Sequence, residues 1–220
     1  MSESPRVCVV LSGCGVFDGA EIHESVISLL VLARRGATVT CAAPDKPQMH
    51  VIDHLRGQVA EGETRNVLVE SARIARGNIT ALSDIEASDF DAVFLPGGFG
   101  AAKNLSDFAV KGAEGSADPE LVRVLQGFRT AGKPIGAVCI APAVLVLALG
   151  EGEVTIGSDE GTAGAILAAG GAHVACPVRH AHVDTQRKLV TAPAYMIDTT
   201  IDQVAVGIEK AIDAMLEMCG

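Results

Sequence analysis

Apolar runs and amphipathic stretches alternate along the chain, and the alternation predicts strands and helices in turn. Apolar, often β-branched runs at 6–12, 38–42, 91–95 and 135–138 predict buried strands. The stretch 21–35 carries apolar side chains at helical spacing, and Gly36 follows it as a helix terminator. The remaining pattern predicts helices at 66–75, 118–131, 140–149, 161–169 and 197–218, a strand at 79–82 and a hairpin of 182–184 with 189–191.

Strands and helices at this spacing are typical of βαβ units, so we expect an α/β fold with a mostly parallel sheet and helices on both faces. No linker or repeat divides the chain, and a single domain over residues 1–220 is expected. The polar stretch 50–62 is ambiguous. Ligands of such sheets bind at the carboxyl ends of the strands, which selects the loops 13–24, 96–104 and 137–142.

Composition narrows the possible partners. The net charge is −10, which disfavours nucleic acid and anionic membrane surfaces because both require a basic footprint. The longest apolar run, 135–149, is too short to span a bilayer, and no signal peptide is expected. Six cysteines are scattered without a disulfide framework, so we expect reduced thiols and a cytoplasmic location.

The strongest chemical signal is Cys139, at the corner between a predicted strand and a predicted helix. This arrangement is typical of a nucleophile elbow, which lifts the side chain above the sheet. The helix N-terminus is expected to lower the pKa of the thiol, and the N–H of Ile140 would face a developing oxyanion. A buried structural cysteine is the alternative interpretation.

A glycine turn follows another central strand at 96–100. Its glycines permit positive φ, so the N–H groups of Gly98 and Phe99 could complete an oxyanion hole beside Cys139. Cys14 and Asn104 lie on the loops selected above and are candidates to line the same pocket.

The first loop offers three acids, Asp18, Glu21 and Glu24, one of which could exchange protons with the thiol. Acids favoured by the helix dipole are the alternative, and the pattern alone does not choose among the three. A dinucleotide fingerprint at 13–19, with Asp45 as the ribose acid, is one residue too long. The histidines form no complete ligand set with cysteines or acids, so no metal is expected.

Together, the elbow, the glycine turn and the acid in the first helix resemble the class I glutamine amidotransferase-like superfamily, in its PfpI and glyoxalase III-like branch. The similarity runs from about residue 6 to the closing helix and is carried by several long strings. These lie at 11–24, 43–46, 63–68, 96–105, 139–143 and 191–196.

The resemblance implies a flavodoxin-like three-layer sandwich, a homodimer and a glyoxalase that needs neither cofactor nor glutathione, a lyase acting on a small dicarbonyl such as glyoxal. It assigns Cys139 as the nucleophile and Glu24 as the acid beside the thiol. Gly98, Phe99 and Ile140 would supply the oxyanion donors.

One departure bears on the function. Amidotransferases of this superfamily place a catalytic histidine shortly after the elbow, whereas residues 140–159 contain none. Glutamine hydrolysis is therefore not expected from this chain alone. Two alternatives to the glyoxalase remain, a redox-sensing or regulatory protein that uses Cys139 and an amidotransferase-like subunit that depends on a partner.

Overall fold

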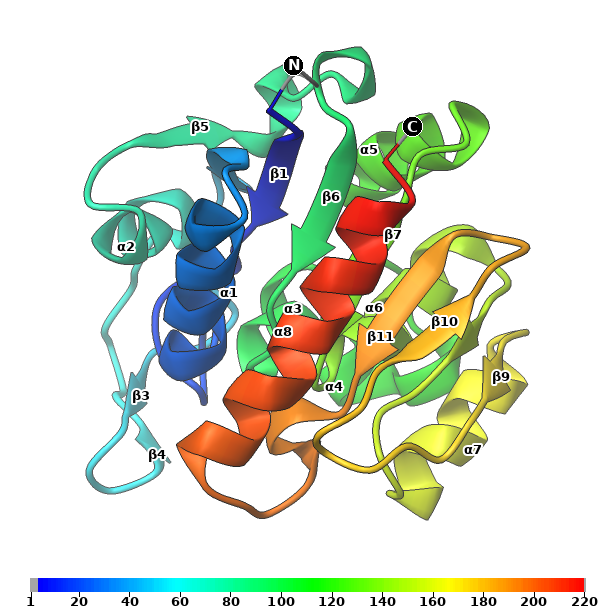
Figure 1. The fold of residues 1–220 in the computed structure, drawn as a ribbon. Coiled ribbons are helices and arrows are strands. Elements are labelled where there is room, and N and C mark those ends of the chain that lie inside the picture. Colours follow the sequence, from blue (N-terminus) through cyan, green and yellow to red (C-terminus); the bar gives the residue numbers. More distant parts are fainter. Residues whose placement is uncertain (1–3, 220) are drawn as a thin grey trace.

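A seven-stranded sheet forms the middle layer of the fold (Figure 1). The computed structural model describes residues 4–219, so residues 1–3 and 220 of the expected domain lie outside the described residues. In spatial order the strands are β10 (His182–Asp184), β11 (Leu189–Ala192), β7 (Ile135–Val138), β6 (Ala92–Leu95), β1 (Arg6–Val10), β2 (Thr38–Ala43) and β5 (Ile79–Ala81). All run parallel except β10, which pairs antiparallel with β11 at one edge.

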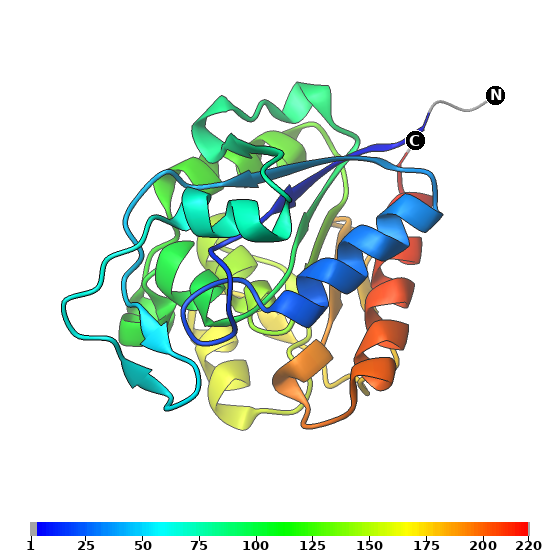
Figure 2. The ribbon, with the colours of Figure 1, turned by 90° about the vertical axis from the view of Figure 1, so that its left-hand side faces the viewer.

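Helices cover both faces of this sheet, as expected. One face packs against α1 (Ile22–Arg34), α2 (Val67–Ile74) and α8 (Ile201–Glu217). The other packs against α3 (Phe99–Asn104), α5 (Pro119–Thr130), α6 (Ala141–Leu149) and α7 (Glu160–Ala168). Figure 2 shows α1 and α8 lying together on one side of the sheet. The expected α/β, flavodoxin-like three-layer sandwich is confirmed.

The central strands are apolar throughout because both of their faces are buried. In β1, Val7 and Val9 face the layer of α1 and α8, whereas Cys8 and Val10 face the layer of α5 and α6. All four side chains are fully buried. Such continuous apolar runs are typical of parallel sheets covered on both sides.

Several elements differ from the sequence-based prediction. The closing helix α8 begins at Ile201 rather than at Ile197, because Ile197 has an extended backbone and Thr200 is the N-cap. The ambiguous stretch 50–62 contains a short hairpin of β3 (Ile52–Asp53) and β4 (Gln58–Val59). A small parallel pair, β8 (Glu153–Val154) with β9 (Ala172–His173), and the one-turn helix α4 (Phe108–Lys111) were not predicted.

Candidate active site

Cys139 lies at the carboxyl end of β7, at the sharp turn into α6. Its φ is +63°, a left-handed backbone conformation that is uncommon for a residue other than glycine. The N–H of Cys139 donates to the carbonyl of Ala192 at the end of the neighbouring β11, at 3.0 Å. The structure therefore contains the strained strand–turn–helix corner expected of a nucleophile elbow.

Glu24 reaches Cys139 from the first turn of α1. Its side chain is fully buried, and its carboxylate lies beside Cys139, where each group changes the pKa of the other. The N–H of Gly97 donates to Oε2 at 2.9 Å, and the N–H of Tyr195 donates to Oε1 at 3.3 Å. Of the three acids in the first loop, Glu24 is thus the one that the structure joins to the thiol.

The other two acids of that loop have different places. Glu21 is the N-cap of α1, where its Oε2 accepts the N–H of Glu24 at 2.7 Å. Asp18 holds the loop itself, because its Oδ2 accepts the N–H of Ile52 at 2.7 Å.

Gly97 packs against both Cys139 and Glu24 with no space for a side chain. A Cβ at this position would lie 2.3 Å from the Cys139 Cβ and 2.8 Å from Oε2 of Glu24. The next residue, Gly98, has φ +94°, and a Cβ there would lie 2.4 Å from the N of Glu21 and from the O of Gly19. The two glycines allow the end of β6 to approach both α1 and the elbow.

The environment of Glu24 favours its protonated form. Burial, and after it the nearby Glu21 carboxylate, raise the pKa of Glu24 from 4.5 to about 7. The hydrogen bonds from the N–H groups of Tyr195 and Gly97 limit this rise because they stabilise the charged carboxylate. Glu24 can therefore both accept and return a proton near neutral pH.

The thiol differs from the expectation drawn from the sequence. Burial raises the pKa of Cys139 well above its usual value of 9.0, and the charge of Glu24 raises it further. The N–H groups of Gly98 and Ile140 act in the opposite direction without outweighing these effects. The prediction of a lowered thiol pKa was wrong because it considered the helix N-terminus and neither the burial nor the adjacent acid.

Two backbone N–H groups favour the thiolate form of Cys139, those of Gly98 and Ile140. They approach from the ends of two neighbouring strands, β6 and β7, in the arrangement of an oxyanion hole. Phe99 differs from its expected role, because its N–H already donates to the carbonyl of Val16 at 2.7 Å and its ring is half exposed. The N–H of Phe99 is therefore not one of the donors beside the sulfur.

Cys14 and Asn104 do not join this group. Asn104 is buried and fully paired: its Nδ2 donates to the carbonyls of Ser12 and Asp18, and its Oδ1 accepts the N–H of Met49. It braces the first loop. Cys14 is half buried and lines a separate hollow between α1 and α2. The pattern indicated the right loops, but it could not show which way each side chain turns.

Sequence reasoning also missed two residues that hold Glu24 in place, Gly97 and Tyr195. Tyr195 lies just beyond the end of β11, and the rule that selects loops at strand ends applies to it as well. The signal was present in the predicted hairpin of 182–184 with 189–191. It was missed because that hairpin was not placed beside β7, where the structure pairs it.

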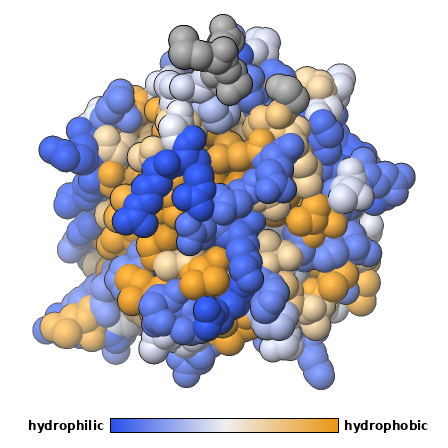
Figure 3. Space-filling view, viewed as in Figure 1, coloured by the Kyte–Doolittle hydropathy of each residue, from blue (hydrophilic) through white to orange (hydrophobic). Residues whose placement is uncertain are grey.

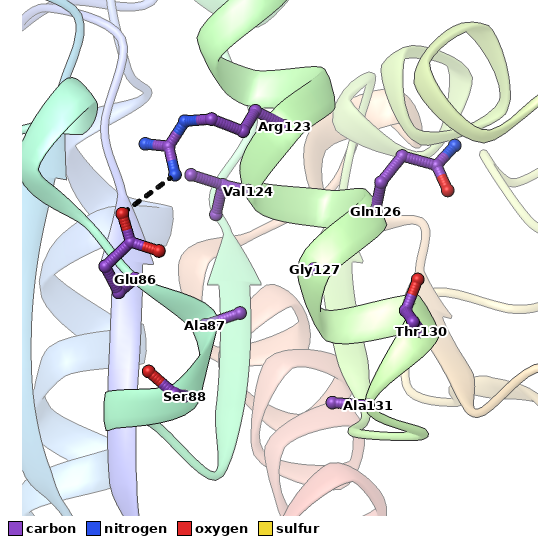
Figure 4. A pocket seen from close by; sticks show the side chains of 9 residues that line it. All are labelled: Glu86, Ala87, Ser88, Arg123, Val124, Gln126, Gly127, Thr130 and Ala131. Carbon is purple, nitrogen blue, oxygen red and sulfur yellow. Dashed lines mark hydrogen bonds and ion pairs between the residues drawn. The ribbon is translucent and has the colours of Figure 1, made fainter.

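A hollow of about 650 Å³ lies elsewhere, between α5 and the 3₁₀ turn η2 (Ala87–Asp89) (Figure 4). These two elements lead into the amino ends of β6 and β7, opposite the elbow. The cation at its rim, Arg123, is engaged by the carbonyls of Leu82, Ser83 and Ile85 and by an ion pair with Glu86. This hollow offers no reactive group.

The structure also bears on metal, membrane and dinucleotide binding. Within residues 4–219, no group of three or more histidine, cysteine or acidic side chains is arranged to hold a metal ion. Within the same residues, no helix combines the length and the apolarity needed to cross a bilayer. Asp45, the alternative ribose acid, accepts the side-chain amide of Asn66 at 2.8 Å.

Several known proteins are similar to this chain in sequence and fold. The chain is 51% identical over 224 residues to the human "Glutamine amidotransferase-like class 1 domain-containing protein 3, mitochondrial", covering 98% of this chain and 84% of that protein. It is 49% identical to the rat "ES1 protein homolog, mitochondrial", with the same shares covered. A crystal structure of an isoprenoid biosynthesis protein with amidotransferase-like domain from Ehrlichia chaffeensis superposes with a TM-score of 0.90 at 39% identity, over 96% of this chain and 99% of that one.

A more distant likeness concerns the fold alone. Glyoxalase III from Candida albicans superposes with a TM-score of 0.64 at 16% identity, over 98% of each chain.

These relatives correct the expected cytoplasmic location. The human and rat proteins, at about half identity over nearly the whole chain, are mitochondrial by name, and so is a zebrafish ES1 protein at 35% identity. The prediction was wrong because free thiols and composition indicate a reducing environment rather than one compartment. The profile of the DJ-1/PfpI family matches residues 7–198. With its elbow cysteine, its buried glutamate and this match, the chain belongs to the DJ-1/PfpI family.

Proposed function

We propose that this protein is a cofactor-independent glyoxalase, which converts a small dicarbonyl such as glyoxal into the corresponding hydroxy acid. The observation that carries the proposal is the position of the buried Glu24 carboxylate beside the Cys139 thiol, where each group changes the pKa of the other. A nucleophile and an acid–base group side by side are what an internal proton transfer on a two-carbon substrate requires.

The first step forms a hemithioacetal. The sulfur of Cys139 attacks one aldehyde carbon, Glu24 takes the thiol proton, and the proton then passes to the new alkoxide. A thiol whose pKa is raised is a poor nucleophile by itself, so the attack depends on this simultaneous proton transfer. The N–H groups of Gly98 and Ile140 would stabilise the oxyanion as it forms.

The next steps move one hydrogen between two carbons. Glu24 removes the proton from the sulfur-bearing carbon to give an enediol and returns it to the neighbouring carbon, which leaves a thioester of glycolate. Water then hydrolyses the thioester, releases glycolate and restores the thiol. Overall, glyoxal and one water give glycolate, with no external oxidant or reductant. A pKa near 7 suits Glu24 to both halves of the transfer.

The alternatives fit the site less well. A redox sensor reacts through its thiolate, whereas burial and Glu24 raise the pKa of Cys139. An amidotransferase would need an imidazole at the thiol, and residues 140–159 supply none. The relatives' names do not specify a reaction for this chain.

The test is glyoxal consumption and glycolate formation without glutathione, for the wild type and for Cys139→Ala. Turnover by the wild type that is lost in Cys139→Ala supports the proposal. Cys14→Ala is the matched control, because Cys14 is a half-buried thiol outside the site, and it should retain activity. Activity that survives in Cys139→Ala, or wild-type protein without turnover, would contradict the proposed function.

A further inference from the structure

Tyr195 contacts two consecutive residues at the start of α1. It is the chain's single tyrosine. Its backbone N–H donates to Oε1 of Glu24 at 3.3 Å, while its phenol oxygen lies 2.8 Å from Nδ1 of His23. The two rings are tilted against each other with centroids 5.8 Å apart. One residue near the end of the chain thus holds both the buried acid and its exposed neighbour.

The backbone before Tyr195 is strained in a way that serves this contact. Ala194 has φ +45°, a left-handed conformation that costs an alanine about 1 kcal/mol or more, and its side chain is fully buried. The turn directs the next N–H toward Glu24. Two residues earlier, the carbonyl of Ala192 accepts the N–H of Cys139 at 3.0 Å. The segment 192–195 therefore touches both members of the thiol–acid pair.

The two N–H groups that donate to the Glu24 carboxylate belong to segments that differ in how firmly they are anchored. Gly97, on the buried Oε2 side, packs against the Cβ of Cys139 and the carbonyl of Val138. Tyr195, on the Oε1 side, belongs to a three-residue 3₁₀ turn, η4 (Ala194–Met196), which has no side-chain cap. The phenol contact with His23 is the side-chain hydrogen bond that anchors this turn to α1.

We propose that Tyr195 is a positioning residue, which uses its phenol contact with His23 to keep its N–H on Glu24 and so fixes how Glu24 presents its carboxylate to Cys139. This inference rests on the proposed function for its effect on turnover. Its effect on the reactivity of the thiol does not depend on that function.

Loss of this contact would change the pH at which Glu24 ionises. The N–H of Tyr195 stabilises the charged carboxylate, so loosening it would raise the pKa of Glu24 above about 7. The titratable groups that act on Glu24 include Cys139, Glu21 and the phenol of Tyr195, and His23 is next to it in the chain. Neither Cys139 nor Glu21 is altered in the variants below.

The test compares Tyr195→Phe, His23→Leu and the double variant in two assays. The first is the pH dependence of Cys139 alkylation by iodoacetamide, followed in a Cys14→Ala background. The second is kcat and KM for glyoxal. Because Glu24 takes the thiol proton as the sulfur attacks, alkylation should follow the ionisation of Glu24. Each single variant should therefore move the midpoint of alkylation to higher pH and lower kcat several-fold at pH 7, with KM within about twofold. His182→Gln, which removes an imidazole that pairs with Glu153 at the far edge of the sheet, is the matched control and should leave both assays unchanged.

The double variant distinguishes a positioning role of Tyr195 from simple destabilisation of the protein. If the two residues act through one contact, the double variant should be no worse than either single variant. His23→Gln keeps a hydrogen-bonding group for the phenol and should recover part of the loss. Unchanged alkylation profiles, or effects that add in the double variant, would overturn the inference. A wild type without glyoxal turnover would contradict the proposed function, while the alkylation assay would still judge the role of Tyr195.

Discussion

The Glu24 carboxylate and the Cys139 thiol lie beside each other and each changes the pKa of the other, with the carboxylate fully buried and the cysteine only 7% exposed. The two groups come from different elements, the start of α1 and the end of β7. Burial makes a charge on either group costly, so the ionisation of one directly affects the other. Most of the protein's expected behaviour follows from this pair.

The pH dependence of turnover should report the ionisation of Glu24. Below pH about 7 the carboxyl group is protonated and cannot accept the thiol proton. We expect kcat/KM for glyoxal to rise about tenfold per pH unit up to pH about 7 and then to level off. Initial rates between pH 5 and 8.5 measure this directly. A profile that is flat through this range would show that Glu24 is not the base.

Glu24→Gln should change how stability depends on pH. The folded protein holds the Glu24 proton up to pH about 7, whereas the unfolded chain releases it near 4.5. Between these values the folded state binds more protons, so the free energy of unfolding of the wild type falls as pH rises. The variant lacks this term, and its stability relative to the wild type should improve by up to about 3 kcal/mol from pH 4.5 to 8.

Denaturant unfolding of both proteins at several pH values provides the measurement. The comparison across pH removes the constant cost of placing an amide between the two N–H donors. A difference that stays constant with pH would mean that the carboxyl group is not held in its protonated form.

Gly97→Ala should disrupt both stability and reactivity. Its Cβ would meet the Cβ of Cys139 at 2.3 Å, and neither the elbow nor the end of β6 can yield without moving the site. Overpacking of this kind costs roughly 1–3 kcal/mol. Gly164→Ala is the control, since its Cβ would meet nothing within 4 Å in the middle of α7, and it should gain roughly 0.5–1 kcal/mol. Thermal unfolding together with Cys139 alkylation separates these outcomes, and wild-type behaviour of Gly97→Ala would contradict the packing argument.

The expected homodimer can be tested on α1. Figure 3 shows apolar surface over the region of α1 and α8, broken by polar side chains. Ile22, Val26 and Leu30 lie at helical spacing on one face of α1 and are 44%, 50% and 47% exposed. We expect Val26→Asp to convert a dimer to a monomer in size-exclusion chromatography with light scattering, whereas Val110→Asp, at another exposed position, should not. A wild type that is monomeric at micromolar concentration would contradict the homodimer.

Much of the fold follows from local patterns, because the buried strands and amphipathic helices carry their own periodicities. The boundaries of α5, for example, follow from Asp118 as N-cap, with Pro119 in the first turn. Short elements such as the β8–β9 pair were not predictable, since two residues per strand carry no period and are stabilised only by tertiary contacts.

The candidate site was predictable in part. The strand–corner–helix pattern points to Cys139, but the choice of Glu24 among three acids came from the family resemblance, not from the pattern. The pKa of the thiol could not be predicted, since it depends on burial and on a carboxylate 115 positions away in the chain. Tyr195 was missed because its role depends on the position of β11 beside β7.

Folding during synthesis also depends on the segment 192–195. Its backbone hydrogen-bonds to Cys139 through Ala192 and to Glu24 through Tyr195. During synthesis, α1 and the elbow emerge from the ribosome well before the segment 192–195. A nascent chain therefore contains Cys139 and Glu24 before it contains the backbone groups that hydrogen-bond to them. The thiol acquires its final environment only after the segment 192–195 has been made and has folded, so the reactivity of Cys139 can report that step of folding.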